Sequence, residues 1–365
     1  MDEKFVKINK WLYPLSFLYG IGVGLRNKLF DWRILRSKSF DVPVICIGNI
    51  AVGGTGKTPH TEYLIKLLQH DFRIAVLSRG YKRKSKGYIL ANEQSTAQTI
   101  GDEPFQIKNK FPEVTLAVAE SRVEGIEQLL KTKEDRPDVI LLDDAFQHRY
   151  VHAGVYILLT DYHRLFCYDT LLPAGRLREP AKAKDRAQVV VVTKCPPDLK
   201  PIEYNIIAKK LQLYPYQKLF FSTFVYGKLT PILSKEKEKR LLSSIKKEES
   251  VLLVTGIAAP ESIIKEIGKY TGQIETLTFG DHHNFTSKDI KTIEERFAAL
   301  KGEKLIITTE KDASRLVNAT FSNQNIKQYI YALPIEVQIL QGQQHLFNKY
   351  IYGYARKNKR DRTIS

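Results

Sequence analysis

Short apolar runs alternate with helix-like segments through residues 42–225. Uninterrupted apolar runs are typical of strands in a parallel sheet, because helices bury both faces of such a sheet. Helical periodicity lies between several of the runs, as at Thr58–Leu68 and Arg122–Leu130. We therefore predict an α/β domain with a parallel sheet and helices on both faces. Strands are expected at Val42–Ile47, Ile74–Leu77, Thr115–Ala119, Val139–Leu142, Val155–Thr160, Val189–Thr193 and Leu219–Phe224.

A second alternating block predicts a smaller α/β domain, joined to the first near residues 225–232. Residues 234–249 are highly charged and are expected to form an exposed connection or a surface helix. The predicted organisation is an N-terminal segment (1–30), a core domain (31–226), a smaller domain (227–355) and a frayed basic tail (356–365). The elements expected in the second block are strands at Val251–Thr255 and Leu305–Thr308 and helices at Glu261–Tyr270 and Ile290–Leu300.

The N-terminal segment Trp11–Leu25 is apolar and aromatic, and lysines and arginines flank it. It is shorter than the roughly 20 residues that cross a bilayer, and Pro14 and three glycines weaken it further. Aromatic residues between cations suit a helix that lies in the interface of an anionic membrane. A helix packed on the core of its own domain would show the same pattern, so both interpretations stay open.

Charge and cysteine content narrow the class of protein. Lys plus Arg exceed Asp plus Glu by 57 − 40 = 17 among 365 residues. Such an excess favours nucleic acid, an anionic membrane or phosphorylated substrates as partners, although a solvated lysine-rich surface would also explain it. Cys46, Cys167 and Cys195 lie singly, which predicts reduced core residues in a cytosolic protein and no metal or disulfide framework.

Candidate chemistry begins at residues 42–58, where an apolar strand leads into a glycine-rich loop that ends in Gly56-Lys57-Thr58. Loop N–H groups and the N-terminus of the following helix together form a cradle for a triphosphate. We expect Lys57 to reach the terminal phosphates and the Thr58 hydroxyl to help hold Mg²⁺. Ala51 stands where the usual pattern has its first glycine. The predicted nucleotide-binding residues are Gly53, Gly54, Thr55, Gly56, Lys57 and Thr58.

Carboxylates follow two of the predicted elements. Asp143 and Asp144 come directly after the run Val139–Leu142, where a phosphate-binding fold places a carboxylate beside Mg²⁺, although a turn cap would also fit. Asp102 and Glu103 lie in GDEP (101–104), ahead of a helix-like run, and on their own a helix cap explains them.

Histidines and arginines provide further candidates. The loop Asp281-His282-His283 is better suited to one histidine that partners a carboxylate than to a metal pair, because adjacent side chains in an extended chain point apart. Arg79 in SRGY (78–81), and Arg176 with Arg178 on a Pro/Gly-bounded loop, suit phosphate clamping or surface ion pairs.

Single residues separate the classes of phosphate-loop protein. A GTPase would carry Asn-Lys-x-Asp after a late strand, whereas this chain has Thr193-Lys194-Cys195-Pro196. A partitioning-type ATPase would carry lysine at the position of Val52, and no convincing set of helicase motifs is present. A small-molecule or lipid kinase remains. The alternatives are a nucleic-acid-associated ATPase and a non-catalytic, membrane-associated nucleotide-binding module.

Taken together, the motifs give a highly specific combination that resembles the tetraacyldisaccharide 4'-kinase family of the lipid A pathway in Gram-negative bacteria. The resemblance spans roughly residues 10–320. The matching motifs are GNIAVGGTGKTP (48–59), SRGY (78–81), GDEP (101–104), DDAFQHR (143–149), LLPAGRLREP (171–180), TK (193–194), DHH (281–283) and TEKD (309–312).

The resemblance implies transfer of the γ-phosphoryl group of ATP, with Mg²⁺, to the 4'-hydroxyl of a tetraacylated disaccharide 1-phosphate. It implies that Lys57 acts on the phosphates, and that Asp102 and His282 form an acid–base dyad, with His283 as an uncertain neighbour. The residues implied to hold or support the metal are Thr58, Glu103, Asp143 and Asp144.

The family's N-terminal helix, which docks on the inner leaflet, matches Trp11–Leu25. The resemblance therefore implies a peripheral protein at the cytoplasmic face of the bacterial inner membrane. The implied partners are a lipid-linked disaccharide and an anionic membrane surface. We expect no nucleic acid and no obligate protein partner.

Overall fold

The computed structural model describes residues 8–131, 135–234, 237–257, 260–280, 283–317 and 319–364, with side chains as far as Lys357. The chain divides into two compact units. The large unit comprises Met1–Phe224 with Val337–Ser365, and the small unit comprises Val225–Glu336. This division departs from the predicted one, because residues 337–355 had been assigned to the smaller domain and belong to the large unit.

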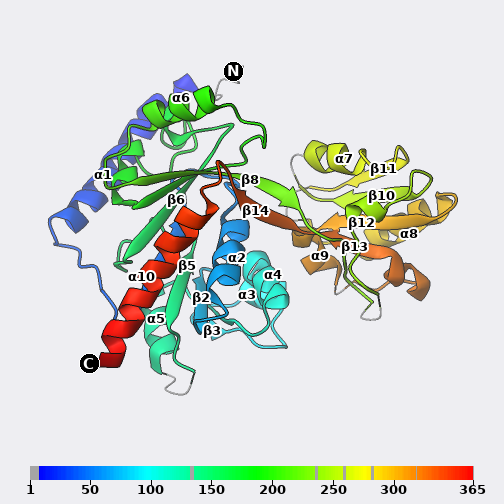
Figure 1. The fold of residues 1–365 in the computed structure, drawn as a ribbon, viewed down its shortest axis with the longest axis horizontal. Helices are drawn as coiled ribbons and strands as arrows, with labels where there is room; N and C mark the ends of the chain where they lie inside the picture. Colours follow the sequence, from blue (N-terminus) through cyan, green and yellow to red (C-terminus); the bar gives the residue numbers. More distant parts are fainter. Residues whose placement is uncertain are drawn as a thin grey trace. The chain divides into compact units, whose positions relative to one another are not determined.

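A nine-stranded sheet, counted over the described residues, runs through the large unit in the order β14-β8-β7-β6-β1-β5-β2-β4-β3 (Figure 1). The neighbours from β8 to β4 pair in parallel, and β3 is antiparallel to β4. The prediction of a parallel α/β sheet is therefore confirmed. The strands are β1 (Val44–Gly48), β2 (Ile74–Ser78), β3 (Ile89–Leu90), β4 (Thr115–Val118), β5 (Val139–Asp143), β6 (Val155–Asp161), β7 (Val189–Thr193), β8 (Lys218–Tyr226) and β14 (Ile335–Ile339).

Every residue of β1, β2, β5 and β7 is buried, as expected for strands covered on both faces. In a parallel sheet the carboxyl ends of the strands share one edge, and there β1 leads into the phosphate loop while β5 ends at Asp143. The helices of this unit are α1 (Tyr13–Asp31), α2 (Lys57–Leu68), α3 (Ala97–Ile100), α4 (Asp102–Lys110), α5 (Arg122–Lys131), α6 (Pro201–Leu211) and α10 (Gln344–Ile364).

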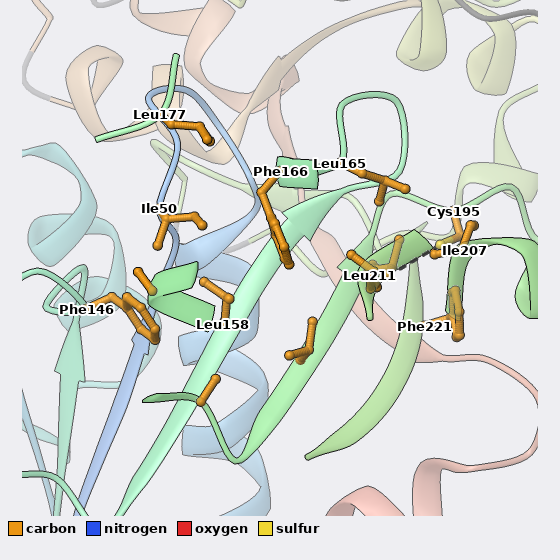
Figure 2. Close-up of a cluster of buried hydrophobic side chains, with 14 of the residues drawn as sticks. Ile50, Phe146, Leu158, Leu165, Phe166, Leu177, Cys195, Ile207, Leu211 and Phe221 are labelled. Atoms are coloured by element: carbon orange, nitrogen blue, oxygen red, sulfur yellow. Dashed lines mark hydrogen bonds between the residues drawn. The ribbon is translucent and has the colours of Figure 1, made fainter. Parts of the chain in front are cut away.

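Figure 2 shows one hydrophobic cluster, which combines side chains of β6, β7 and β8 with residues of α6 and of the loops that follow β1 and β5. Ile50, from the start of the phosphate loop, packs there with Phe146 and Leu177, which come from two other predicted motifs. Cys195 lies in the same cluster, and Cys46 is buried in β1. All three cysteines are free in the structure, and burial raises the pKa of Cys46 and Cys195 to about 12.

Helix α10 returns the chain to the large unit and packs beside α2 (Figure 1). The Tyr63 hydroxyl donates to Asn348 Oδ1 at 2.7 Å, and the Tyr354 hydroxyl donates to the carbonyl of Val44 at 3.4 Å. Residues 356–364, which the sequence analysis expected to be frayed, continue this helix. The contacts of α10 with Tyr63 and Val44 join residues that are far apart in the sequence. The local pattern of apolar and polar residues therefore could not predict them.

Helix α1 packs along the loop at residues 171–178. The Ser16 hydroxyl donates to the carbonyl of Leu171, and the Tyr19 hydroxyl donates to that of Arg178. Ser16 and Phe30 are buried, whereas Trp11, just before the helix, is 93% exposed and Phe17 is 69% exposed. The other large apolar side chains exposed here are Tyr13, Leu15, Leu18, Tyr19, Ile21, Leu25, Trp32 and Ile34.

One side of this helix therefore packs on its own domain, while much of its apolar surface stays uncovered. Within the described residues, none of the helices combines the length and apolar character that a bilayer crossing requires.

The small unit holds a five-stranded sheet, again counted over described residues, in the order β11-β10-β12-β13-β9. Its four parallel strands confirm the smaller α/β domain. Within the charged stretch predicted to be exposed, residues 237–249 are partly covered, because Leu242 and Ile245 are buried and Arg240 forms an ion pair with Glu249 through two hydrogen bonds. The elements are β9 (Thr230–Pro231), β10 (Ser250–Thr255), α7 (Glu261–Ile267), β11 (Ile274–Thr278), α8 (Ser287–Ala299), β12 (Lys304–Thr309), α9 (Glu310–Leu316) and β13 (Ile330–Leu333).

Candidate active site

The phosphate loop follows β1 and ends at Gly56, the residue before α2. Gly56 has a left-handed backbone (φ 83°), which places the free N–H groups of the first turn of α2 at the mouth of the loop. Two neighbouring side chains hold the loop from outside. Asn49 Nδ2 donates to Thr55 Oγ1 at 2.8 Å, and Thr193 Oγ1 donates to the carbonyl of Thr55 at 3.0 Å.

Ala51, which stands where the usual pattern has glycine, lies in an isolated β-bridge. Ala51 forms an antiparallel bridge with Leu177, and the N–H of Val52 donates to the carbonyl of Arg176 at 2.7 Å. An extended residue tolerates a Cβ, so glycine is unnecessary at this position.

Lys57 and Asp144 meet at the mouth of the loop. Lys57 Nζ lies 3.6 Å from Asp144 Oδ2, and both side chains are largely buried. Asp144 has a left-handed backbone (φ 47°), a conformation that non-glycine residues adopt rarely and most often at functional sites. Arg178 Nη1 lies 3.5 Å from Asp144 Oδ1, so Arg178 belongs to this cluster, whereas Arg176 is exposed.

Asp143 lies beneath this cluster, at the end of β5. It is buried and accepts hydrogen bonds from Thr61 Oγ1 at 3.0 Å and from Ser78 Oγ at 3.5 Å. Burial, followed by the charge of Asp144, raises its pKa to about 6, although Lys57 opposes the shift. A carboxylate whose pKa is raised by burial and by a second carboxylate is typical of a functional site.

The SRGY and GDEP motifs meet backbone to backbone through two glycines. A Cβ on Gly101 would lie 3.1 Å from Gly80 Cα, and a Cβ on Gly80 would lie 2.6 Å from the carbonyl oxygen of Ile100. Both glycines have positive φ, so larger residues would be strained there as well as crowded. The contact brings Ser78 of one motif and the start of α4 in the other to the same edge of the sheet.

Asp102 and Glu103 lie in the first turn of α4. The N-cap position belongs to Gly101, so neither carboxylate is the N-cap residue that a simple helix cap would require. Glu103 is close enough for its negative charge to raise the pKa of Asp143, although its effect is smaller than those of burial and Asp144. The far end of α4 is tied to α2, because Lys110 Nζ lies 2.6 Å from the buried carboxylate of Glu62.

Arg122, which the sequence analysis missed, is 1% exposed at the start of α5. Its Nη1 donates to the carbonyl of Ala119 at 2.7 Å. Burial lowers its pKa to about 10, while Asp143 and Asp144 oppose the shift. A buried cation near two aspartates balances their charge, and only the fold brings residue 122 to them.

His283 lies in the small unit, whereas Asp281 and His282 lie outside the described residues. The Nε2 atom of His283 lies 2.9 Å from Asp289 Oδ2, and its ring stacks on Phe279 with centroids 4.8 Å apart. Hydrogen bonds from Thr286, followed by that from His283, lower the pKa of Asp289 to about 2. His283 is thus already engaged in local structure.

Asp312, in the TEKD motif, is completely buried at the carboxyl edge of the small sheet. Its Oδ2 accepts from Thr309 Oγ1 at 2.7 Å, from the N–H of Gly256 at 2.9 Å and from Thr255 Oγ1 at 3.3 Å. Arg315 Nη1 lies 3.7 Å from Asp312 Oδ1 and donates to the carbonyl of His283 at 3.3 Å. This motif therefore joins the ends of β10 and β12 to the loop after β11.

Among the residues that the structure describes, no three His, Cys, Asp or Glu side chains gather in a metal-binding arrangement. Mg²⁺ needs only one or two carboxylates, because it keeps several waters and binds substrate phosphates. Asp143 and Asp144, with the Thr58 hydroxyl at the start of α2, supply the hard oxygen atoms that this ion prefers.

Comparison of the sequence with known proteins points to one family. A model described as "Tetraacyldisaccharide-1-P 4'-kinase" matches residues 8–352, which extends beyond the predicted span of 10–320. The chain is 61% identical over 372 residues to the tetraacyldisaccharide 4'-kinase of Bacteroides thetaiotaomicron, covering 100% of this chain and 98% of the relative. It is 47% identical to that of Porphyromonas gingivalis, covering 97% of this chain and 99% of the relative.

A solved structure agrees. The crystal structure of LpxK from Aquifex aeolicus in complex with ATP superposes with a TM-score of 0.73 at 30% identity, covering 95% of this chain and 99% of that one. A family match over nearly the whole chain, together with close relatives of the same length, shows that the chain belongs to the tetraacyldisaccharide 4'-kinase family.

Proposed function

We propose that the large unit binds ATP through Gly53–Thr58 and that the chain uses it to phosphorylate the 4'-hydroxyl of a tetraacyldisaccharide 1-phosphate. This ATP-dependent step in lipid A synthesis is the activity of the family to which the chain belongs. The observation that carries the assignment of the site is the cluster of Lys57, Asp143 and Asp144 at the mouth of the phosphate loop. Phosphoryl transfer needs mainly positioning and charge neutralisation, which this cluster provides.

Mg²⁺ fits the same cluster. Thr58, Asp143 and Asp144 would hold the ion, with Glu103 supporting it or an attached water, and bound Mg²⁺ would neutralise charge on the phosphates. The raised pKa of Asp143 is consistent with a carboxylate that a cation would keep ionised. Lys57, now paired with Asp144, would turn to the terminal phosphates when the nucleotide binds.

Asp102 and His282 are our candidates for the acid–base dyad, in which Asp102 accepts the proton of the sugar hydroxyl and His282 sets its charge state. His283 is the less suitable of the two histidines, because its ring is bonded to Asp289 and stacked on Phe279. We therefore assign the catalytic role to His282 and a structural role to His283.

The exposed apolar surface of α1 suits an anionic membrane surface, which places the chain in our proposal at the cytoplasmic face of the inner membrane. Lifting acyl chains out of a bilayer would cost about 0.8 kcal/mol per CH₂, so an enzyme that works at the surface avoids this cost. Replacing Phe17 and Leu18 by serine should weaken binding to anionic vesicles about tenfold or more, with unchanged ATP affinity. Equal loss of both would contradict a membrane role for the helix.

Transfer of labelled phosphate tests the whole proposal. Purified protein, labelled ATP and tetraacyldisaccharide 1-phosphate in detergent micelles should give a 4'-phosphorylated lipid in the presence of Mg²⁺. His282→Ala should remove most of the turnover, whereas His283→Ala should mainly lower stability. The reverse result would exchange their roles, and the absence of any labelled lipid would overturn the function.

A nucleic-acid-associated ATPase was the alternative, and the family membership does not favour it. The same assay with DNA or RNA in place of the lipid tests this alternative. We expect no stimulation of ATP hydrolysis by either polymer. Stimulation with a steep salt dependence would support the alternative instead.

A further inference from the structure

A buried histidine with no assigned role lies directly behind the phosphate loop. His60 follows the GNIAVGGTGKTP motif by one residue, on the first turn of α2. It is only 3% exposed, and its two ring nitrogens lie against a backbone carbonyl and a serine hydroxyl. A neutral imidazole has one donor nitrogen and one acceptor nitrogen, and the contacts of the ring show which is which.

The ring joins two elements. Nδ1 lies 2.7 Å from the carbonyl oxygen of Gly56, which can only accept, so Nδ1 carries the proton. Nε2 lies 3.0 Å from Ser222 Oγ in β8, and in the neutral ring it accepts from that hydroxyl. Ser222 is completely buried, so neither hydrogen bond competes with bulk water.

The bond to Gly56 sets the direction of an N–H group that faces the nucleotide. Gly56 C=O and Lys57 N–H belong to one planar trans peptide, in which they point in opposite directions. Holding the carbonyl toward His60 therefore turns the N–H of Lys57 toward the mouth of the loop. The backbone bond from His60 N–H to the same carbonyl is long, at 3.3 Å, so the ring supplies the shorter of the two contacts.

A second residue of β8, Phe224, contacts the same glycine. A Cβ added to Gly56 would lie 2.5 Å from Phe224 Cζ, so the phenyl ring already covers Gly56 Cα. Ser222 and Phe224 are two residues apart and share one face of the strand. Strand β8 thus contacts the end of the phosphate loop twice, and its next residue, Val225, begins the small unit.

We infer that His60 is a positioning residue of the phosphate loop, which orients the Gly56–Lys57 peptide and links occupancy of the loop to strand β8, the strand that leads into the small unit. Binding of ATP orders the loop peptide, and through the His60 ring it orders Ser222 and the segment after it. By linkage, as long as the ring connects the two, a contact that orders β8 strengthens nucleotide binding by the same factor. The inference rests on the proposed nucleotide site.

ATP affinities measured by calorimetry distinguish the contact of His60 Nδ1 with Gly56 from that of Nε2 with Ser222. His60→Leu loses both and should weaken ATP binding about three- to tenfold, the value of one internal hydrogen bond. His60→Asn keeps a donor near the position of Nδ1 and should recover most of the affinity, whereas His60→Gln reaches toward Ser222 and should not. The exposed His70, just after α2, gives the matched control His70→Leu, which should bind like wild type.

Steady-state kinetics and hydrogen exchange test the link itself. His60→Leu should raise the KM for ATP with little change in the KM for the lipid acceptor. In wild type, saturating ATP should slow exchange in residues 218–226, and in His60→Leu at saturating ATP this slowing should be absent. In Ser222→Ala, saturating ATP should likewise fail to slow hydrogen exchange in residues 218–226. Most of the ATP affinity should remain, because the contact of His60 with Gly56 is kept.

The outcomes separate the two proposals. If wild type fails to bind ATP, the proposed function fails. If wild type binds and folded His60→Leu binds equally well, the positioning role is overturned. Thermal melts show whether His60→Leu is folded, and if it is not, equal ATP affinities for the Asn and Gln variants would overturn the role.

Discussion

Two buried aspartates occupy comparable places in the two units, and they have opposite surroundings. Asp143 is the last residue of a parallel strand of the large sheet, accepts hydrogen bonds from two hydroxyl groups and has a raised pKa. Asp312, at the carboxyl edge of the small sheet, receives three donors on one oxygen and faces the Arg315 guanidinium with the other. The same topology thus supplies one carboxylate whose pKa is raised by burial and another whose charge is matched by an arginine of its own unit.

The contrast shows how a parallel α/β edge is used in each case. Polar groups lie at the strand ends of both sheets. The number of donors that the protein itself supplies decides whether a carboxylate still has acceptor capacity for a cation. On this view, changes at the large edge should affect chemistry and changes at the small edge should affect folding.

The largest expected effect is on chemistry at the large edge. Lys57→Ala should lower turnover about 10²–10³-fold, because it removes a cation aimed at the transferring phosphoryl group. Thermal unfolding should change little, since Lys57 pairs with Asp144 at 3.6 Å without a buried hydrogen bond. Phosphate transfer and circular dichroism melts measure the two effects. Retained turnover would remove Lys57 from the site.

At the small edge, Asp312→Asn should destabilise the small unit by about 2–4 kcal/mol. The amide leaves Arg315 without the Asp312 charge and places a donor where a carboxylate oxygen faced that cation. Hydrogen exchange in β10 and β12 reports the loss locally. If exchange there is unchanged, Asp312 does not hold this edge together.

Replacing Asp143 by asparagine at the large edge should change the stability of its unit in the opposite direction. A folded-state pKa of about 6, against an ordinary 3.8, means that folding favours protonated Asp143. This group therefore costs no stability below pH 3.8, and the cost grows as pH rises to 6 and stays constant above it.

Without added Mg²⁺ or ATP at pH 8, Asp143→Asn should thus raise the stability of the large unit by on the order of 2–3 kcal/mol, while abolishing turnover. Chemical denaturation at pH 8 and pH 4 measures the difference, which should shrink at pH 4. A destabilised variant at pH 8 would mean that ionised Asp143 supports the fold and that the two edges do not differ.

A matched pair of threonines gives the smallest effect. Thr255→Val removes one of three donors to Asp312 and should cost about 1 kcal/mol of stability. Thr61→Val removes the shorter hydrogen bond to Asp143, which should raise the pKa of Asp143 further and weaken Mg²⁺-dependent ATP binding. Denaturant melts and calorimetry of Mg²⁺–ATP distinguish these responses. Similar losses of stability in both variants would contradict the comparison.

Local patterns predicted most of the architecture because strands buried on both faces read as uninterrupted apolar runs. Val139–Leu142 followed by Asp143-Asp144 is the clearest example, since a buried strand and its polar end lie in consecutive residues. Lys57 and Thr58 were likewise singled out by a contiguous motif, and both lie at the start of α2.

The missed features depend on contacts that no local window contains. Arg122 and Thr61 meet Asp143 only after folding, and His60 reaches Ser222 across 162 positions. Helix α10 contacts Tyr63 through Asn348, so its place in the large unit had no sequence signature. Packing specificity of this kind arises from tertiary structure rather than from periodicity.

The small unit is an insertion, since the chain leaves the large unit after Phe224 and re-enters it at Val337. During synthesis the ribosome therefore completes the small unit before it makes α10, the helix that covers Tyr63 on α2. The large unit is the last part of the protein to be finished, and a prematurely terminated chain would contain the phosphate loop and α2 without the helix that packs against α2.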